Sequence, residues 1–166
     1  MAAQPETVQA LQAWREIPLR IERSIEGLSE AQLDLRAETP GLTGREIVHH
    51  LVEANLIAST ILIAALARNG TVYDWSWVQP GGDWMKRMGY DRAPVQPALA
   101  TLRALCEYVS GLIAAAPDGF ARSVQLLDAP GAELYAKTVG GILVQEVEHA
   151  AEHLGTLSQI RAAHGL

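Results

Sequence analysis

The chain has 166 residues, of which 49% are hydrophobic and 19% charged, and its formal net charge is −6. This length and composition predict one globular domain spanning residues 1–166 and exclude a disordered chain. The negative charge and the lack of a basic run argue against a nucleic-acid-binding protein. Cys106 is the single cysteine, which excludes an internal disulfide and fits the reducing conditions of the cytoplasm.

In chain order, the first predicted helix covers about residues 6–26, where apolar side chains recur at the spacing of a buried helix face. The segment GLSEAQL follows this helix. Within it, Ser29 and Gln32 have the pattern of a capping box, which predicts a stop followed by a short helical turn.

A second, long helix is predicted to begin after Thr43, which has the capping-box pattern with Glu46, and to reach about Arg68. It is apolar on most sides, so we expect a central position in the fold. Its most apolar stretch, residues 56–67, is shorter than the roughly 20 residues that a membrane-spanning helix needs. We therefore expect a buried helix and no membrane association.

Residues 71–95 have no sustained period and hold three of the four tryptophans among glycines and prolines, which predicts a long ordered loop. Aromatic side chains of such a loop can form the wall of a ligand-binding cleft. They can equally form a dimer contact or a lid over the end of the fold. The candidates for a cleft wall are Trp75, Trp77 and Trp84.

Two further helices are predicted, over about residues 97–115 and 137–164. A turn-rich segment that can include an extended piece separates them. No strand pattern is long enough to predict a sheet. The sequence therefore predicts an all-α four-helix bundle, with residues 71–95 connecting the second and third helices.

The last predicted helix carries His149 and His153, which are four residues apart and therefore lie on one face. This face is apolar at both ends and polar in the middle, so either it is solvated or it faces something in the core that binds nitrogen ligands. On the second helix, His50 lies on an apolar stripe, whereas His49 points away and is expected at the edge of the bundle. Three buried imidazoles without a shared ligand would be costly.

Three histidines with an open coordination position make a catalytic zinc site, and nickel, iron and manganese also accept neutral imidazole. We therefore predict that His50, His149 and His153 bind one divalent metal ion, with water or substrate completing its coordination. Glu146 and Glu53 are candidates for a fourth ligand, an imidazole-orienting partner or a proton acceptor. The alternative for both glutamates is an ordinary solvated position.

These motifs resemble the DinB/YfiT superfamily of metal-dependent four-helix bundles. The resemblance covers nearly the whole chain and rests on GLSEAQL, LTGREIVHHLVEAN and EHAAEHLGTLSQIRAAHG. A family histidine followed by leucine near the start of the second helix matches His50 and Leu51, and the family's paired histidines match His149 and His153. The resemblance implies an unusual order of helices, a long crossover loop between the second and third helices, and a metal in a cleft at one end.

The resemblance also implies a function, because characterised members include thiol-dependent transferases and a mycothiol-dependent maleylpyruvate isomerase. A low-molecular-weight thiol bound to a metal is deprotonated and can be delivered to an electrophile. The same ion can instead activate water, which would make the protein a hydrolase. A third reading is a non-catalytic bundle that binds a metal or ligand as a stress-related sensor or structural protein. Homodimers are common in the family, so we expect a homodimer acting on a small-molecule substrate.

Overall fold

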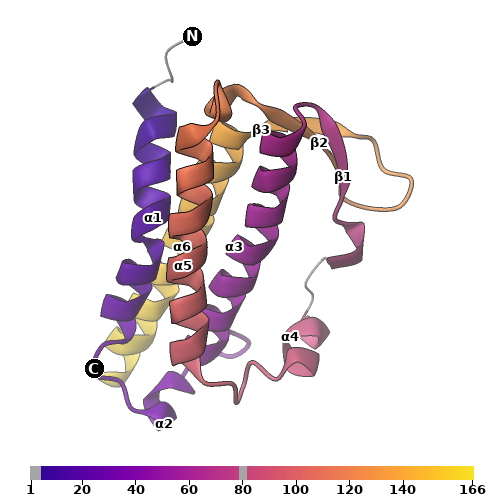
Figure 1. The fold of residues 1–166 in the computed structure, drawn as a ribbon. Helices are drawn as coiled ribbons and strands as arrows, with labels where there is room; N and C mark the ends of the chain where they lie inside the picture. Colours follow the sequence, from indigo (N-terminus) through magenta and orange to yellow (C-terminus); the bar gives the residue numbers. More distant parts are fainter. Residues whose placement is uncertain (1–4, 79–81) are drawn as a thin grey trace.

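The computed structural model describes residues 5–78 and 82–166, and its four long helices form a bundle (Figure 1). This confirms the predicted fold class. The ends of each long helix lie within about two residues of those that the sequence pattern predicts, the usual uncertainty of a helix boundary. The four helices are α1 (Pro5–Ile25), α3 (Gly44–Ala67), α5 (Val95–Ala115) and α6 (Val139–His164).

Capping boxes begin two of the helices, as the sequence predicts. At the start of α2 (Glu30–Leu33), Oγ of Ser29 accepts a hydrogen bond from the backbone N–H of Gln32, whose side chain accepts from the backbone N–H of Ser29. Thr43 and Glu46 make the same pair of bonds at the start of α3. These bonds satisfy N–H groups that have no partner inside a helix, so they fix where α3 begins.

All four long helices contribute to one apolar core. α1 packs against α5 and α6, and α3 packs against the same two helices. A buried hydrogen bond of 2.5 Å from the indole N–H of Trp14 to Oδ1 of Asn55 links α1 to α3. Because a buried polar group needs its partner, this bond favours one register of α1 on α3. The largest fully buried side chains are Trp14, Ile17, Ile21, Ile47, Leu51, Leu62, Leu99, Leu102, Ile113, Leu143, Leu157 and Ile160.

A three-stranded sheet lies at one end of the bundle, so the prediction that the chain has no sheet is wrong (Figure 1). β1 (Thr71–Asp74) pairs in parallel with β2 (Ser123–Leu127), which pairs antiparallel with β3 (Tyr135–Thr138). The strands have four or five residues each, too few for alternation to stand out among turn residues. Val124 and Leu126 of β2 are buried against the helices.

The crossover from α3 to α5 is more regular than the loop predicted over residues 71–95. After β1 it forms a 3-10 helix, η1 (Ser76–Val78), and a short helix, α4 (Gly82–Met88). Elements this short have no period that a sequence pattern can reveal. In Figure 1, β1 lies at the sheet end of the bundle and α4 near the other end, so the crossover follows the length of α3. A second 3-10 helix, η2 (Gly119–Ala121), precedes β2.

Arg45 anchors the end of the crossover to the start of α3. Its side chain is buried and pairs with Glu30 and Asp34 at 2.7 Å each, and it donates a hydrogen bond to the carbonyl oxygen of Ala93. Nε2 of His49 lies 3.1 Å from the same oxygen. His49 is only 9% exposed, so its expected position at the edge of the bundle is wrong, because the crossover covers that side of α3.

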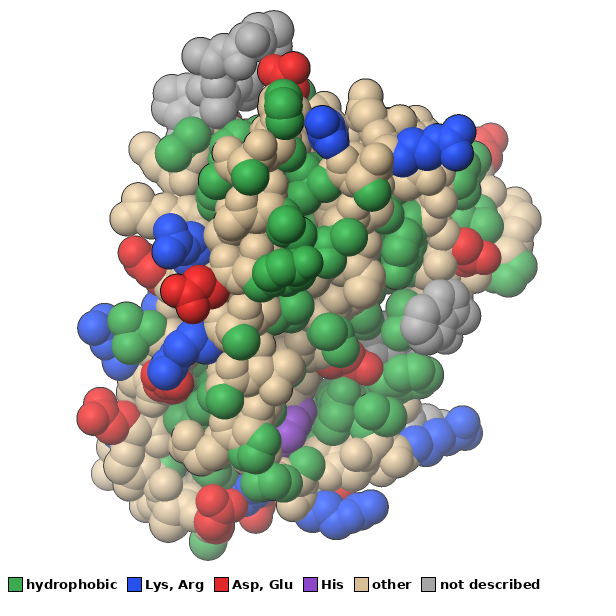
Figure 2. All heavy atoms as spheres, in the orientation of Figure 1, with side chains coloured by type: hydrophobic (Ala, Val, Ile, Leu, Met, Phe, Trp, Pro, Cys, Tyr) green, Lys and Arg blue, Asp and Glu red, His purple; other side chains and the backbone are tan. Residues whose placement is uncertain are grey.

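By length and composition alone, α3 and α5 are apolar enough to cross a membrane. Both supply many buried side chains to the core, and a core helix needs the same composition. On the face shown in Figure 2, Lys and Arg side chains are scattered among Asp and Glu side chains, with apolar groups between them. Histidine atoms are visible on this face only inside a recess.

Candidate metal centre

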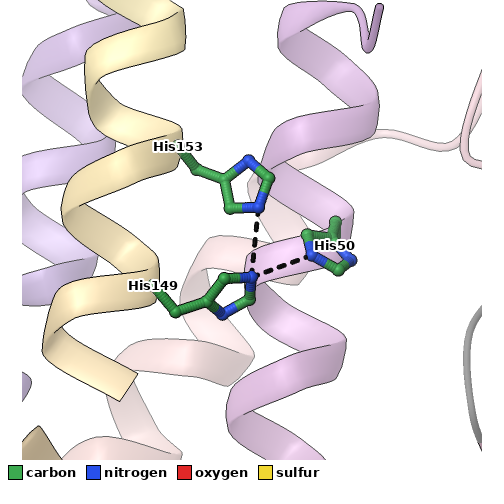
Figure 3. Close-up of side chains that lie close together, drawn as sticks. All are labelled: His50, His149 and His153. Atoms are coloured by element: carbon green, nitrogen blue, oxygen red, sulfur yellow. Dashed lines mark hydrogen bonds between the residues drawn. The ribbon is translucent and has the colours of Figure 1, made fainter. Parts of the chain in front are cut away.

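Three histidine side chains converge between α3 and α6 (Figure 3). His50 lies near the start of α3, and His149 and His153 come from successive turns of α6. Nε2 of His149 lies 3.1 Å from Nε2 of His50 and 3.1 Å from Nε2 of His153. One ligand nitrogen from each residue lies within 4.8 Å of the other two. The structure thus brings together all three predicted metal-binding residues, which we call the histidine cluster.

The geometry of the histidine cluster fits a shared divalent ion. An ion held tetrahedrally by imidazole nitrogens at about 2.0–2.1 Å keeps neighbouring nitrogens about 3.3 Å apart. The observed 3.1 Å separations are close to that spacing. The rings meet at 69–87°, so their nitrogens can face one centre without the rings stacking. Among the described residues, no fourth histidine, cysteine or carboxylate joins the cluster, which is typical of catalytic and not structural zinc sites.

Burial favours the uncharged imidazoles, the form that binds metal. Desolvation is the main cause that lowers the pKa values of all three imidazoles below the ordinary value, and the pKa of His153 falls to about 4. The neighbouring imidazoles contribute to the lowered pKa values of His50 and His153, because two imidazolium charges side by side would repel each other. The histidine cluster therefore presents neutral nitrogen ligands at neutral pH.

Glu146 lies beside the histidine cluster on α6. Its side chain is 13% exposed, and Oε2 lies 4.0 Å from Nδ1 of His149 without a hydrogen-bond partner among the described residues. Burial raises the pKa of Glu146 to about 7, although the positive charge of Lys137 acts in the opposite direction. The alternative of an ordinary solvated carboxylate is therefore wrong for Glu146. A carboxyl group that titrates near neutral pH can accept or donate a proton.

Glu53 connects the crossover to the same part of α3. Its Oε1 accepts a hydrogen bond from the indole N–H of Trp84. Burial and a hydrogen bond to Glu53 raise the pKa of Tyr90, and the Tyr90 ring stacks on His49 with centroids 5.2 Å apart. These contacts place Glu53 in a polar link between α3 and the crossover, one turn from His50.

A pocket of about 450 Å³ lies between α3, α6 and the sheet and includes two residues of the histidine cluster. Trp75 lines it, as the sequence suggested, whereas Trp84 and Glu53 do not. The side chain of Trp77 lies outside the described part of the structure. The lining residues are His50, Ala54, Ile57, Ala58, Ile61, Trp75, Leu126, Tyr135, Lys137, Ile142, Gln145, Glu146, Glu148, His149 and Glu152.

Asp128 holds two aromatic residues of the pocket wall. The indole N–H of Trp75 donates to Oδ1 of Asp128 at 2.5 Å, and the hydroxyl of Tyr135 donates to the same oxygen at 2.9 Å. Burial and the Asp128 carboxylate raise the pKa of Tyr135 to about 12. No sequence pattern pointed to Asp128, Tyr135 and Lys137, because only the unpredicted sheet brings these residues beside α3 and α6.

Comparisons with known proteins agree with this architecture. The structure is similar to that of YfiT from Bacillus subtilis, with a TM-score of 0.82 and 20% sequence identity over 99% of this chain and 91% of that chain. YfiT is described as a probable metal-dependent hydrolase with an unusual four-helix bundle topology. No curated protein matches this sequence. The family model of the DinB superfamily matches residues 13–157, and the chain therefore belongs to the DinB superfamily, as the sequence motifs predicted.

Proposed function

We propose that this protein is a metal-dependent enzyme in which His50, His149 and His153 hold one divalent ion. The observation that carries the proposal is the convergence of their nitrogens at the wall of a pocket. Zinc, nickel, iron and manganese all suit three neutral imidazoles, and the pocket leaves space for a substrate beside them. When bound, such an ion lowers the pKa of a coordinated thiol or water and so supplies a nucleophile at neutral pH.

The residues around the histidine cluster can serve two functions, proton transfer and substrate binding. Oε2 of Glu146 can accept the proton that the nucleophile loses, because its pKa of about 7 allows both protonation states near neutral pH. The apolar walls, among them Ile57, Ile61 and Trp75, can exclude water and hold an organic electrophile. The bonds from Trp75 and Tyr135 to Asp128 keep one wall in place.

For the reaction, we favour thiol-dependent S-transfer with a low-molecular-weight thiol, which the family resemblance supports. A metal-dependent hydrolase is the second candidate, and the likeness to YfiT supports it. A non-catalytic bundle that binds metal as a sensor or structural protein is the third. The open side of the histidine cluster favours either enzyme over the structural role.

We also propose that the protein is cytoplasmic and forms a homodimer. A cytoplasmic location is supported by the single, buried cysteine, Cys106. A homodimer is supported by the family resemblance. Size-exclusion chromatography with light scattering measures the assembly directly, and a mass equal to one chain at micromolar concentration would contradict the homodimer.

The deciding experiment compares two assays on protein purified without a histidine tag and loaded with one metal at a time. The first measures consumption of bacillithiol, mycothiol, glutathione or coenzyme A in the presence of a chromogenic electrophile. The second measures release of a chromophore from ester and amide substrates without any thiol. Turnover in the first assay that disappears in His149→Ala supports the transferase. Thiol-independent turnover supports the hydrolase, and no turnover by a fully metal-loaded protein supports the non-catalytic role.

A further inference from the structure

Lys137 is a half-buried cation in the wall of the pocket. It lies on β3, just before α6 begins. Within the described parts of the chain, its side chain forms no hydrogen bond and no ion pair. A half-buried ammonium group without a partner is unfavourable relative to one that pairs with an anion. The pocket therefore contains a positive charge that the protein itself does not neutralise by direct contact.

The pocket has two ends with different chemistry. His149 follows Val139 by ten positions, a rise of about 15 Å along α6, which separates the backbone beside Lys137 from the histidine cluster. Ile57, Ile61 and Ile142 line the stretch between the two ends. A ligand lying along the pocket would therefore place a reacting group at the histidine cluster, an apolar body on the isoleucines, and its other end near Lys137.

Three carboxylates also line the pocket, but their positions differ from that of Lys137. Glu146 lies beside His149 at the metal end, where the charge of Lys137 acts on its pKa although no ion pair forms between the two described side chains. Glu148 and Glu152 are exposed to solvent on α6. Water and salt screen an exposed charge more strongly than a half-buried one. Lys137 is thus the charge that decides which ligand end group the sheet end of the pocket accepts.

We propose that the substrate is an organic molecule with an apolar body and an anionic group, and that Lys137 binds this anionic group. This assignment rests on the proposed function, because it concerns the same pocket. It narrows the substrate class to carboxylates or similar anions whose reacting group is separated from the charge by an apolar segment.

The test measures binding of three matched probes to metal-free protein by NMR titration. The probes are 4-phenylbutyrate, 4-phenylbutan-1-ol and 4-phenylbutylamine, which share an apolar body and differ in the end group. A chelator removes metal ions, since a carboxylate could otherwise bind to the metal. We expect the carboxylate to bind about three- to tenfold more tightly than the alcohol, the range for one partly buried ion pair.

Lys137→Met should abolish this preference and leave the affinity for the alcohol within about twofold, which also shows that the pocket remains folded. Lys86→Met is the matched control, because Lys86 is the other lysine, is exposed on α4 and does not line the pocket. The assignment is overturned if wild-type protein binds the alcohol or the amine as tightly as the carboxylate, if it binds none of the probes, or if Lys137→Met keeps the preference. A carboxylate preference in a protein that binds no metal would contradict the proposed function alone.

Discussion

Replacing Glu146 with glutamine should change how the stability of the metal-free protein depends on pH. The folded-state pKa of about 7 lies above the unfolded value of 4.5, so the folded protein holds this proton more tightly. The resulting stability is fully present below pH 4.5 and is lost as the pH rises through 7. Integrated between pH 5 and pH 8, the loss is about 2.5 kcal/mol. Glutamine does not ionise, so the Glu146→Gln protein should lack this loss.

The assay is urea unfolding followed by circular dichroism at pH 5 and pH 8, with a chelator present. From pH 5 to pH 8, the unfolding free energy of Glu146→Gln relative to that of wild type should rise by about 2.5 kcal/mol. The histidine cluster titrates in both proteins, so its contribution largely cancels in this comparison. Adding zinc should shrink the shift, because a nearby cation favours the ionised form of Glu146.

Glu148→Gln provides the control, since Glu148 lies on the same helix and lines the same pocket but is exposed. Its pH-dependent shift should stay within about 0.5 kcal/mol, as for ordinary surface substitutions. Parallel pH profiles for wild type and Glu146→Gln would refute the claim that Glu146 is a buried carboxyl group of the pocket.

Three further predictions concern metal binding, the pocket wall and the crossover. Metal affinity, measured by competition with a chelator, should fall as the pH drops below 6.5. It should continue to fall toward pH 4, because the lowered imidazole pKa values delay protonation. A metal affinity that does not change between neutral pH and pH 4 would contradict histidine ligands. Asp128→Asn should lower the pKa of Tyr135 from about 12 part of the way to 10, which an NMR titration of labelled tyrosine can measure. An unchanged pKa of Tyr135 in the variant would show that burial alone raises it. Arg45→Met should cost about 2 kcal/mol of unfolding free energy through lost charged hydrogen bonds, and a urea midpoint equal to that of wild type would show that these bonds contribute nothing.

The sequence predicted the helices and the histidine cluster because both depend on local patterns. Capping boxes at Ser29 and Thr43 mark helix starts through bonds that span three residues. His149 and His153 share a face because of helix geometry alone. Their meeting with His50 depends on how α3 and α6 pack. The apolar stripe around His50 on α3 predicts that its side chain approaches the other two, since such a stripe faces the core.

The sheet and the environment of the carboxylates were not predictable in the same way. β1 pairs with a strand far away in the sequence, since Thr71 lies opposite Val124, whereas β2 and β3 are neighbours in the chain. Each of the three strands is too short to carry a readable alternation. The burial of Glu146 depends on the pocket that these strands help to enclose. The periodicity of the helix alone places Glu146 between the buried and the exposed face and does not predict its burial. The burial of His49 depends in the same way on the path of the crossover, which no local pattern specifies.

The central claim is that the histidine cluster binds one divalent ion, and elemental analysis of tag-free protein tests it most directly. We predict about one equivalent of a single divalent metal per wild-type chain, the stoichiometry of a site with three imidazole ligands. His50→Ala should lose the metal while keeping its helical circular dichroism. His164→Ala should keep the metal, because His164 is exposed and its Nε2 lies 3.0 Å from the carbonyl oxygen of Arg36, outside the histidine cluster. Wild-type protein without bound metal, or a His50→Ala protein with unchanged metal content, would contradict the account.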